Sequence, residues 1–199
     1  MIASLEGLPG AGKTTTTAHV ATRLKLFAVR ETTGDHPFLG QVYDDADRDD
    51  LTVELAFLIV HANAYRRIDR TRPSLADFSP VKDLLFAEDM LRGRELAFFK
   101  QAYELIYEGY EPPDLVIYLR AEPEVCLARI KRRYKHDLRR QFEQGLTLER
   151  LQRMHERYEA AINRLGRQVF TYDVKAGVDE DGVADDVTSL LHAHHIGGL

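Results

Sequence analysis

The sequence predicts a three-layer α/β fold built around a parallel sheet of about five strands. Residues 2–5 are a short, mostly apolar run, and residues 115–119 are an apolar run of strand length, which is typical of a strand covered on both faces. Segments with helical apolar periodicity separate these runs, and this alternation indicates right-handed βαβ units. Residues 7–14 fit the pattern G-x-x-x-x-G-K-[ST] between a predicted strand and a predicted helix. The fold therefore begins with a phosphate-binding P-loop.

The P-loop predicts a nucleoside triphosphate site. Its glycines let successive backbone N–H groups turn toward phosphate oxygens, and the helix predicted over 15–26 directs its positive end to the same place. Lys13 is expected to reach the β- and γ-phosphates, and the Thr14 hydroxyl is expected to hold Mg²⁺. The expected triphosphate-binding residues are Gly7, Leu8, Pro9, Gly10, Ala11, Gly12, Lys13, Thr14 and Thr15.

The remaining elements follow from apolar periodicity and from the positions of proline and glycine. Pro37 can open a short helix, and the acidic residues between 44 and 50 are expected to form a solvated loop with helix-capping roles. Further strands are predicted over 27–31, 75–77 and 169–172, and helices over 51–67, 80–90, 95–107, 123–133, 148–165 and 179–195.

Two carboxylates follow predicted strands. Glu31 ends the strand over 27–31, and Asp77 ends the strand over 75–77. Ligands of parallel sheets bind outside the carboxyl ends of the strands, where the P-loop also lies. We therefore expect Glu31 and Asp77 to lie beside the bound phosphates.

Composition narrows the class of protein. At 199 residues the chain is long enough for one domain with its own core, and we expect residues 1–199 to form a single domain. The formal net charge of −5 argues against a nucleic acid polymer as the main partner. Cys126 is the single cysteine, so no internal disulfide can form, and no signal peptide or membrane-spanning run is visible. A cytoplasmic location is expected.

The class of P-loop protein follows by elimination. GTPases usually carry Asn-Lys-x-Asp, but neither Asn63 nor Asn163 is followed by lysine. Larger ATPases need an apolar strand that ends in an acid, whereas the strand over 115–119 is followed by Arg120. The basic run from Arg129 to Arg140 is typical of a lid that closes over a transferring phosphoryl group. These features favour a P-loop kinase fold with an arginine-rich lid at about 131–146.

Five segments resemble the bacterial deoxynucleoside kinases, within the wider thymidylate-kinase-like group. The similarity extends from the P-loop to about Ile162. In order, the matching segments are Glu31 with His36-Pro37-Phe38-Leu39 and Tyr43-Asp44; Asp77-Phe78-Ser79-Pro80-Val81-Lys82-Asp83 with Phe86-Ala87; Asp114 to Ile130; Phe142-Glu143-Gln144; and Leu151 with His155 to Glu159.

The resemblance implies specific roles. Glu31 would be the general base for a nucleoside 5′-hydroxyl, and Asp77 would lie near Mg²⁺ through its water shell. Tyr43 and Glu143 match residues that bind the sugar 3′-hydroxyl. Arg129, Arg132 and Arg133 would contact phosphates, and with Lys13 and Glu31 they form the predicted catalytic set.

The chain departs from the family pattern at two positions. Glu54 stands where the family has a base-reading glutamine, and an ionised carboxylate offers only acceptors. Guanine presents two adjacent donors, so Glu54 suits guanine, unless it only lines the rim of its helix. Phe78 stands where the family has an arginine near the 5′-oxygen, and Lys82 is expected to supply the missing charge if it points inward.

The sequence thus predicts an ATP- and Mg²⁺-dependent (deoxy)nucleoside kinase that is a homodimer by resemblance. The sequence leaves two alternative functions open. A nucleoside monophosphate kinase of the thymidylate kinase type would need a fixed arginine near the acceptor, and Arg30 or Arg66 could serve. A regulatory protein could bind nucleotide without phosphorylating any acceptor.

Overall fold

The computed structural model describes residues 1–31, 36–38, 49–175 and 180–194. Within these ranges a single five-stranded sheet has the strand order β2-β3-β1-β4-β5, with every pair parallel. The parallel sheet predicted from the sequence is confirmed. Its strands are β1 (Ile2–Glu6), β2 (Phe27–Val29), β3 (Ser74–Ala76), β4 (Leu115–Arg120) and β5 (Val169–Asp173).

The central strand explains why the sheet is parallel throughout. Every residue of β1 is buried, and β1 pairs with β3 on one side and with β4 on the other. Ala3 lies opposite both Leu75 and Leu115, so apolar side chains line up across the centre of the sheet. All-parallel sheets occur almost only where helices cover both faces, so the complete burial of β1 fits the parallel order.

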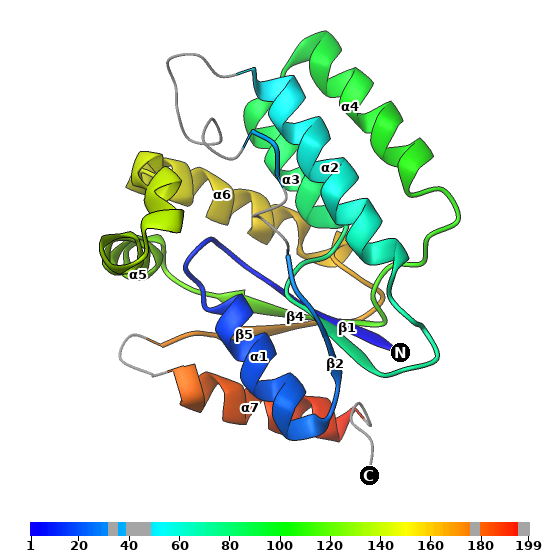
Figure 1. Ribbon diagram of the computed structural model, residues 1–199, viewed down its shortest axis with the longest axis vertical. Coiled ribbons are helices and arrows are strands. Elements are labelled where there is room, and N and C mark those ends of the chain that lie inside the picture. Colours follow the sequence, from blue (N-terminus) through cyan, green and yellow to red (C-terminus); the bar gives the residue numbers. More distant parts are fainter. Residues whose placement is uncertain (32–35, 39–48, 176–179, 195–199) are drawn as a thin grey trace.

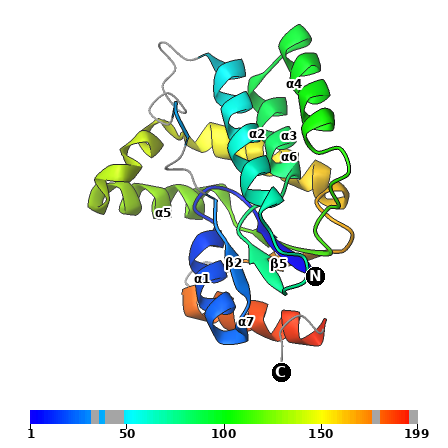
Figure 2. The same ribbon diagram turned by 45° about the vertical axis from the view of Figure 1, so that its right-hand side comes forward.

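Helices cover the two faces unequally, as Figures 1 and 2 show. α1 and α7 pack together on one face, whereas α2, α3, α4 and α6 cover the other. α5 and the 3₁₀ segment η3 stand at the P-loop end of the sheet. The bounds are α1 (Lys13–Leu24), α2 (Asp50–Arg66), α3 (Val81–Met90), α4 (Gly93–Ile106), α5 (Pro123–His136), η3 (Leu138–Gly145), α6 (Leu148–Ala161), η4 (Ile162–Arg164) and α7 (Glu180–Ala193).

Some predicted boundaries move by a few residues. α1 begins at Lys13 rather than Thr15, directly after its N-cap residue Gly12, which has a left-handed backbone conformation. β2 ends at Val29, so Glu31 lies just past the strand. Asp49 caps α2, as expected of the acidic connector: its side chain accepts a hydrogen bond from Thr52 N–H.

The predicted short helix at Pro37 lies partly outside the described residues. Pro37 and Phe38 themselves form a turn. Within the described part of the chain, no helix combines the length and the apolar character needed to cross a bilayer.

Candidate active site

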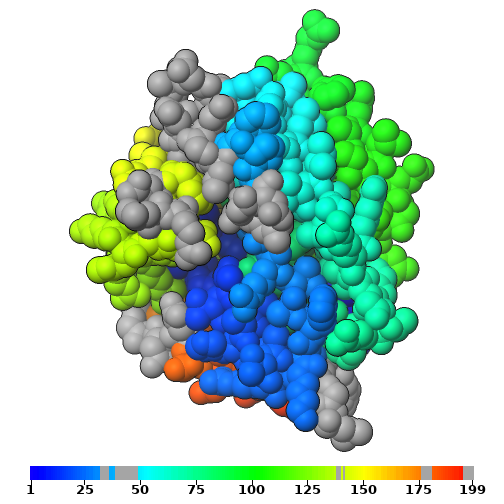
Figure 3. All heavy atoms as spheres, viewed as in Figure 1, coloured from blue at the N-terminus to red at the C-terminus, as the bar shows by residue number. Residues whose placement is uncertain are grey.

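A cavity opens at the carboxyl ends of the strands, above the P-loop. It holds roughly 990 Å³ of space that is continuous with solvent. The space-filling view shows the dark-blue N-terminal segment recessed between α5 and α1 (Figure 3). The cavity is lined by Pro9, Gly10, Gly12, Lys13, Thr14, Thr15, Glu31, Glu54, Phe57, His61, Lys82, Asp83, Phe86, Arg133, Arg140, Phe142, Glu143 and Arg150.

The P-loop glycines have conformations that other residues rarely adopt. Gly10 has φ +83°, and a Cβ added to it would lie 2.6 Å from the Cys126 carbonyl oxygen. Gly12 has φ +103° and caps α1. Arg129 Nη1 lies 3.3 Å from the Ala11 carbonyl oxygen, so α5 packs directly against the loop. This is the backbone geometry that a phosphate cradle needs.

Lys13 projects into the cradle. Its Nζ donates hydrogen bonds to the Gly7 and Leu8 carbonyl oxygens at 2.6 and 3.1 Å. Burial lowers the pKa of Lys13, and the neighbouring Lys82 ammonium lowers it further. The positive charges of Lys13 and Lys82 would both stabilise a polyanion bound at the P-loop.

Thr14 and Asp77 bring hard oxygen donors together beside the loop. The Thr14 hydroxyl donates to Asp77 Oδ2 at 2.7 Å, and Asp77 Oδ1 accepts from the Glu31 backbone N–H at 2.6 Å. Hydroxyl and carboxylate oxygens are the ligands that Mg²⁺ prefers, so the residues present fit this ion. The sequence prediction that Asp77 and Glu31 gather beside the P-loop is confirmed in position.

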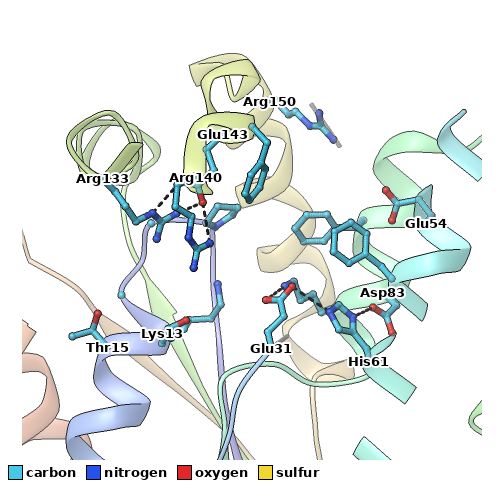
Figure 4. Close-up of a pocket in the computed structure, with 18 residues that line it drawn as sticks. Lys13, Thr15, Glu31, Glu54, His61, Asp83, Arg133, Arg140, Glu143 and Arg150 are labelled. Atoms are coloured by element: carbon cyan, nitrogen blue, oxygen red, sulfur yellow. Dashed lines mark hydrogen bonds and ion pairs between the residues drawn. The ribbon is translucent and has the colours of Figure 1, made fainter. Parts of the chain in front are cut away.

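Glu31 faces Lys13 across the cavity (Figure 4). Its Oε2 accepts a hydrogen bond from Lys82 Nζ at 2.5 Å, and its Oε1 lies 3.2 Å from His61 Nε2. Burial opposes ionisation of Glu31, but Lys82 and His61 outweigh that effect and hold its pKa well below the usual range. Glu31 is therefore a fixed carboxylate, and Lys82 does point inward.

His61 and Asp83 belong to the site although sequence reasoning did not select them. His61 Nδ1 lies 2.5 Å from Asp83 Oδ1, and the Tyr107 hydroxyl donates to Asp83 Oδ2 at 3.0 Å. Burial lowers the pKa of His61, but Asp83 and Glu31 raise it more, to about 9. One signal was available: His61 lies two helical turns beyond Glu54, which puts both on one face of α2.

The lid residues cluster around one buried glutamate. Glu143 is 4% exposed and accepts hydrogen bonds from Arg133 Nε at 3.0 Å and Arg140 Nη1 at 3.3 Å, and a second Arg133 nitrogen also contacts it. Glu143, Arg133 and Arg140 all line the cavity. Arg132, by contrast, is exposed on α5 and does not line the cavity. Arg140 belonged to the basic run but was not singled out from the sequence.

Aromatic rings make up part of the cavity lining. Phe57, Phe86 and Phe142 line the cavity together with Glu54, which is 3% exposed. Flat apolar rings and one buried carboxylate suit a flat heterocycle with hydrogen-bond donors on its edge.

The predicted substrate residue Phe78 is not part of the cavity wall. Phe78 is fully buried and does not line the cavity; its ring stacks on the His61 ring with centroids 4.9 Å apart. Phe78 therefore lies behind the cavity wall, because its apolar ring packs into the core beneath α2. Tyr43 lies outside the described residues.

Known proteins resemble the chain over nearly its whole length. A family model described as deoxynucleoside kinase matches residues 3–192. The chain is 28% identical over 170 residues to the deoxyguanosine kinase of Bacillus subtilis, covering 81% of this chain and 78% of that protein. It is 26% identical over 172 residues to the deoxyadenosine kinase of Dictyostelium discoideum, covering 83% and 68%.

Solved structures agree on the fold. The deoxyadenosine kinase of M. mycoides with bound dATP superposes with a TM-score of 0.82 at 20% identity, over 96% of this chain and all of that one. The same enzyme with bound dCTP gives 0.81 at 19% identity, over 97% and 100%. Neither a monophosphate kinase nor a non-catalytic protein is favoured by these matches. With the family model spanning the P-loop, Glu31 and the lid, the chain belongs to the deoxynucleoside kinase family.

Proposed function

We propose that this protein transfers the γ-phosphoryl group of ATP to the 5′-hydroxyl of a deoxynucleoside, with deoxyguanosine as the preferred acceptor. One observation carries the proposal: Lys13 of the P-loop and Glu31 line the same cavity as Glu54, which lies on the other side of Glu31 from Lys13 (Figure 4). A nucleoside whose base lies against Glu54 would direct its sugar toward Glu31. Its 5′-hydroxyl would then lie between a carboxylate and the P-loop.

Glu31 has the chemistry of the acceptor's general base. Its carboxylate accepts a hydrogen bond from the 5′-hydroxyl and directs the oxygen lone pair at the γ-phosphorus. As the new O–P bond forms, the bond to the β–γ bridging oxygen breaks, the hydroxyl proton passes to Glu31, and ADP leaves. Lys13 and Arg133 offer positive charge to the phosphoryl oxygens, where negative charge spreads. Arg129 stabilises the loop that presents Lys13.

Thr14 and Asp77 would hold Mg²⁺, Thr14 through its hydroxyl and Asp77 directly or through a water molecule. The ion, when bound, neutralises the phosphates and orients them for in-line transfer. The carboxylate of Asp77 also fixes the Glu31 backbone through its N–H group, so one residue serves both halves of the site.

Glu54 supports a preference for guanine. A carboxylate accepts two hydrogen bonds side by side, and guanine offers the adjacent N1–H and N2–H₂ donors, whereas adenine offers a donor next to an acceptor. The B. subtilis relative carries the name deoxyguanosine kinase, which agrees with this reading of Glu54. Glu143 is proposed to bind the sugar 3′-hydroxyl. The roles of Tyr43 and Arg132, the homodimer and the cytoplasmic location stay predictions.

An ATP-coupled assay over eight common nucleosides and their monophosphates tests the function. We expect ADP release with nucleosides, highest kcat/KM for deoxyguanosine, and little with monophosphates. The variant Glu54→Gln should shift the preference toward adenine, while Glu95→Gln on the exposed start of α4 should not. Turnover with monophosphates alone would instead identify a monophosphate kinase. ATP binding without turnover on any acceptor would identify a regulatory protein.

A further inference from the structure

Four charged side chains form one continuous buried chain beside the cavity. In order they are Asp83 of α3, His61 of α2, Glu31 after β2 and Lys82 of α3, joined by contacts of 2.5, 3.2 and 2.5 Å. The side chain of Asp83 is 1% exposed, that of Glu31 is 15% exposed, and that of His61, which lies between them, is 2% exposed. Such a low exposure leaves little water to stabilise any unpaired charge.

The geometry around His61 decides its protonation. Each ring nitrogen faces a carboxylate oxygen, Nδ1 facing Asp83 and Nε2 facing Glu31. A neutral imidazole can donate from only one nitrogen, so its other lone pair would point at a carboxylate. A doubly protonated ring satisfies both contacts and makes the chain of Asp83, His61, Glu31 and Lys82 neutral as a whole. The raised pKa of His61, about 9, agrees.

The ring is also held mechanically. Phe78 stacks on it at a centroid distance of 4.9 Å, and Phe57 lies near it at 5.5 Å. Tyr107 of the segment after α4 donates to the second oxygen of Asp83 at 3.0 Å, so Asp83 cannot turn away without losing that bond. This arrangement gives Phe78 a role. Its ring stacks on His61 and limits the movement of the imidazole, whereas the family pattern has an arginine at position 78.

We propose that His61 is a positioning residue for the phosphoryl transfer: held by Asp83, it fixes the Glu31 carboxylate in the orientation that receives the 5′-hydroxyl. This inference rests on the proposed function. Glu31 has two partners with different tasks. Lys82 faces the cavity and can turn toward the transferring phosphoryl group, whereas His61 is enclosed and keeps Glu31 in place when Lys82 turns. Because the transition state of phosphoryl transfer is loose, orientation of the acceptor counts for more than basicity.

The test uses two substitutions that roughly keep the size of the side chain, Asp83→Asn and His61→Gln. A third variant, Tyr107→Phe, removes only the hydrogen bond to Asp83. We expect kcat to fall about 100-fold in Asp83→Asn, which corresponds to a misplaced reacting group, with a smaller fall in Tyr107→Phe. The deoxynucleoside KM and the ranking of bases should change little. His192→Gln, an exposed histidine on α7, is the matched control and should keep full activity.

The pH dependence of His61 protonation and of kcat distinguishes a positioning role from a purely structural one, because loss of a structural contact would not shift either pH profile. Ring ¹⁵N NMR of the full-length protein should show His61 with both nitrogens protonated at neutral pH and a pKa of about 9. In Asp83→Asn that pKa should fall toward 6.5, and the alkaline limb of the kcat–pH profile should move down with it. The groups that face His61 are Asp83, Glu31 and, at longer range, Lys82, His36 and Tyr107.

Three outcomes would overturn the proposal: a neutral His61 at pH 7, an unchanged kcat in both variants, or a change confined to KM and base ranking. Thermal unfolding of each variant separates a folding defect from lost positioning, since Tyr107→Phe removes a single hydrogen bond. If the wild-type protein phosphorylates no nucleoside, the proposed function fails, and the NMR measurement still tests the charged state of His61 on its own.

Discussion

Lys82 Nζ lies 2.5 Å from Glu31 Oε2, so a buried ammonium group contacts the carboxylate that faces the P-loop. Lys82 is 8% exposed, and Glu31 raises its pKa against the opposing effect of burial. Lys82 therefore stays charged at neutral pH. It lies one helical turn beyond Ser79 at the start of α3, near the fully buried Phe78. The structure thus places a buried positive charge beside Glu31, four positions after Phe78.

Replacing Lys82 by alanine is expected to reduce kcat by about 10²–10³, the usual effect of removing one group that stabilises transition-state charge. The nucleotide dissociation constant should change far less, because the P-loop is untouched. Steady-state kinetics and calorimetry measure the two effects. Lys100→Ala on α4, where the lysine is largely exposed and pairs with Glu88, is the control. Unchanged turnover in Lys82→Ala would show that this charge takes no part in transfer.

Glu31→Gln is expected to lower kcat by about 10²–10⁴, the usual contribution of a positioned general base. Glutamine keeps the size of the side chain but cannot take up the 5′-hydroxyl proton. ATP affinity, measured by calorimetry, should stay near the wild-type value, since Glu31 lies across the cavity from the loop. Glu108→Gln changes an exposed glutamate after α4 and should be silent. Near-normal turnover in Glu31→Gln would remove Glu31 from the chemistry.

The sequence was sufficient for the part of the site that depends on strand order. The P-loop, Glu31 and Asp77 each follow a strand, and parallel strands bring their carboxyl ends to one edge whatever the helices do. Asp77 accordingly contacts both Thr14 and the Glu31 backbone. Because each of these residues directly follows a strand, its place in the sequence largely determines that it lies at the carboxyl edge of the sheet.

The sequence was not sufficient for residues inside helices. His61 and Asp83 lie in α2 and α3, and 22 positions separate them. Whether they meet depends on the rotation and crossing of two helices, which is decided by packing of side chains such as Leu58 and Ala87. Phe78 shows the same limit: it stands where the family has an arginine near the 5′-oxygen, but an aromatic ring gains more by packing against His61 and Tyr65.

Glu143 joins two arginines of the lid, which gives a third prediction. Both Arg133 on α5 and Arg140 in η3 bond to its buried carboxylate. In Glu143→Gln these charge-assisted bonds weaken, so the deoxynucleoside KM should rise about tenfold, an effect of the size of one such bond. Discrimination between deoxynucleosides and 3′-deoxy analogues should also fall. Glu149→Gln on α6, where the side chain is 83% exposed, is the control. An unchanged KM would separate Glu143 from the sugar.

Gly10 of the P-loop occupies a position that only glycine fits without strain. Gly10→Ala combines a positive φ of +83° with a Cβ only 2.6 Å from the Cys126 carbonyl oxygen. The backbone must shift, so ATP affinity should drop sharply along with the melting temperature. Gly109→Ala separates the two effects, because Gly109 has φ +76° and no heavy atom of the described residues lies within 4 Å of an added Cβ. That variant should lose about 1–2 kcal/mol of stability from the positive φ and bind ATP normally. Normal ATP binding by Gly10→Ala would contradict the proposed fit.

The charged chain beside the cavity also predicts how stability depends on pH. The pKa of His61 is raised from 6.5 to about 9, so its contribution is complete below pH 6.5 and is lost as the pH rises through about 9. The pKa of Glu31 lies well below its usual 4.5, so its contribution is complete above pH 4.5 and is lost as the pH falls through the folded-state value. These two groups together predict a plateau in the free energy of unfolding between about pH 4.5 and 6.5, followed by an alkaline decline. Urea unfolding at a series of pH values measures this curve. His61→Gln should lower the plateau and remove much of the decline between pH 6.5 and 9, whereas His192→Gln should leave the curve as it is. A decline of the same size in His61→Gln would mean that another group titrates, and that the imidazole of His61 is already neutral in the folded protein.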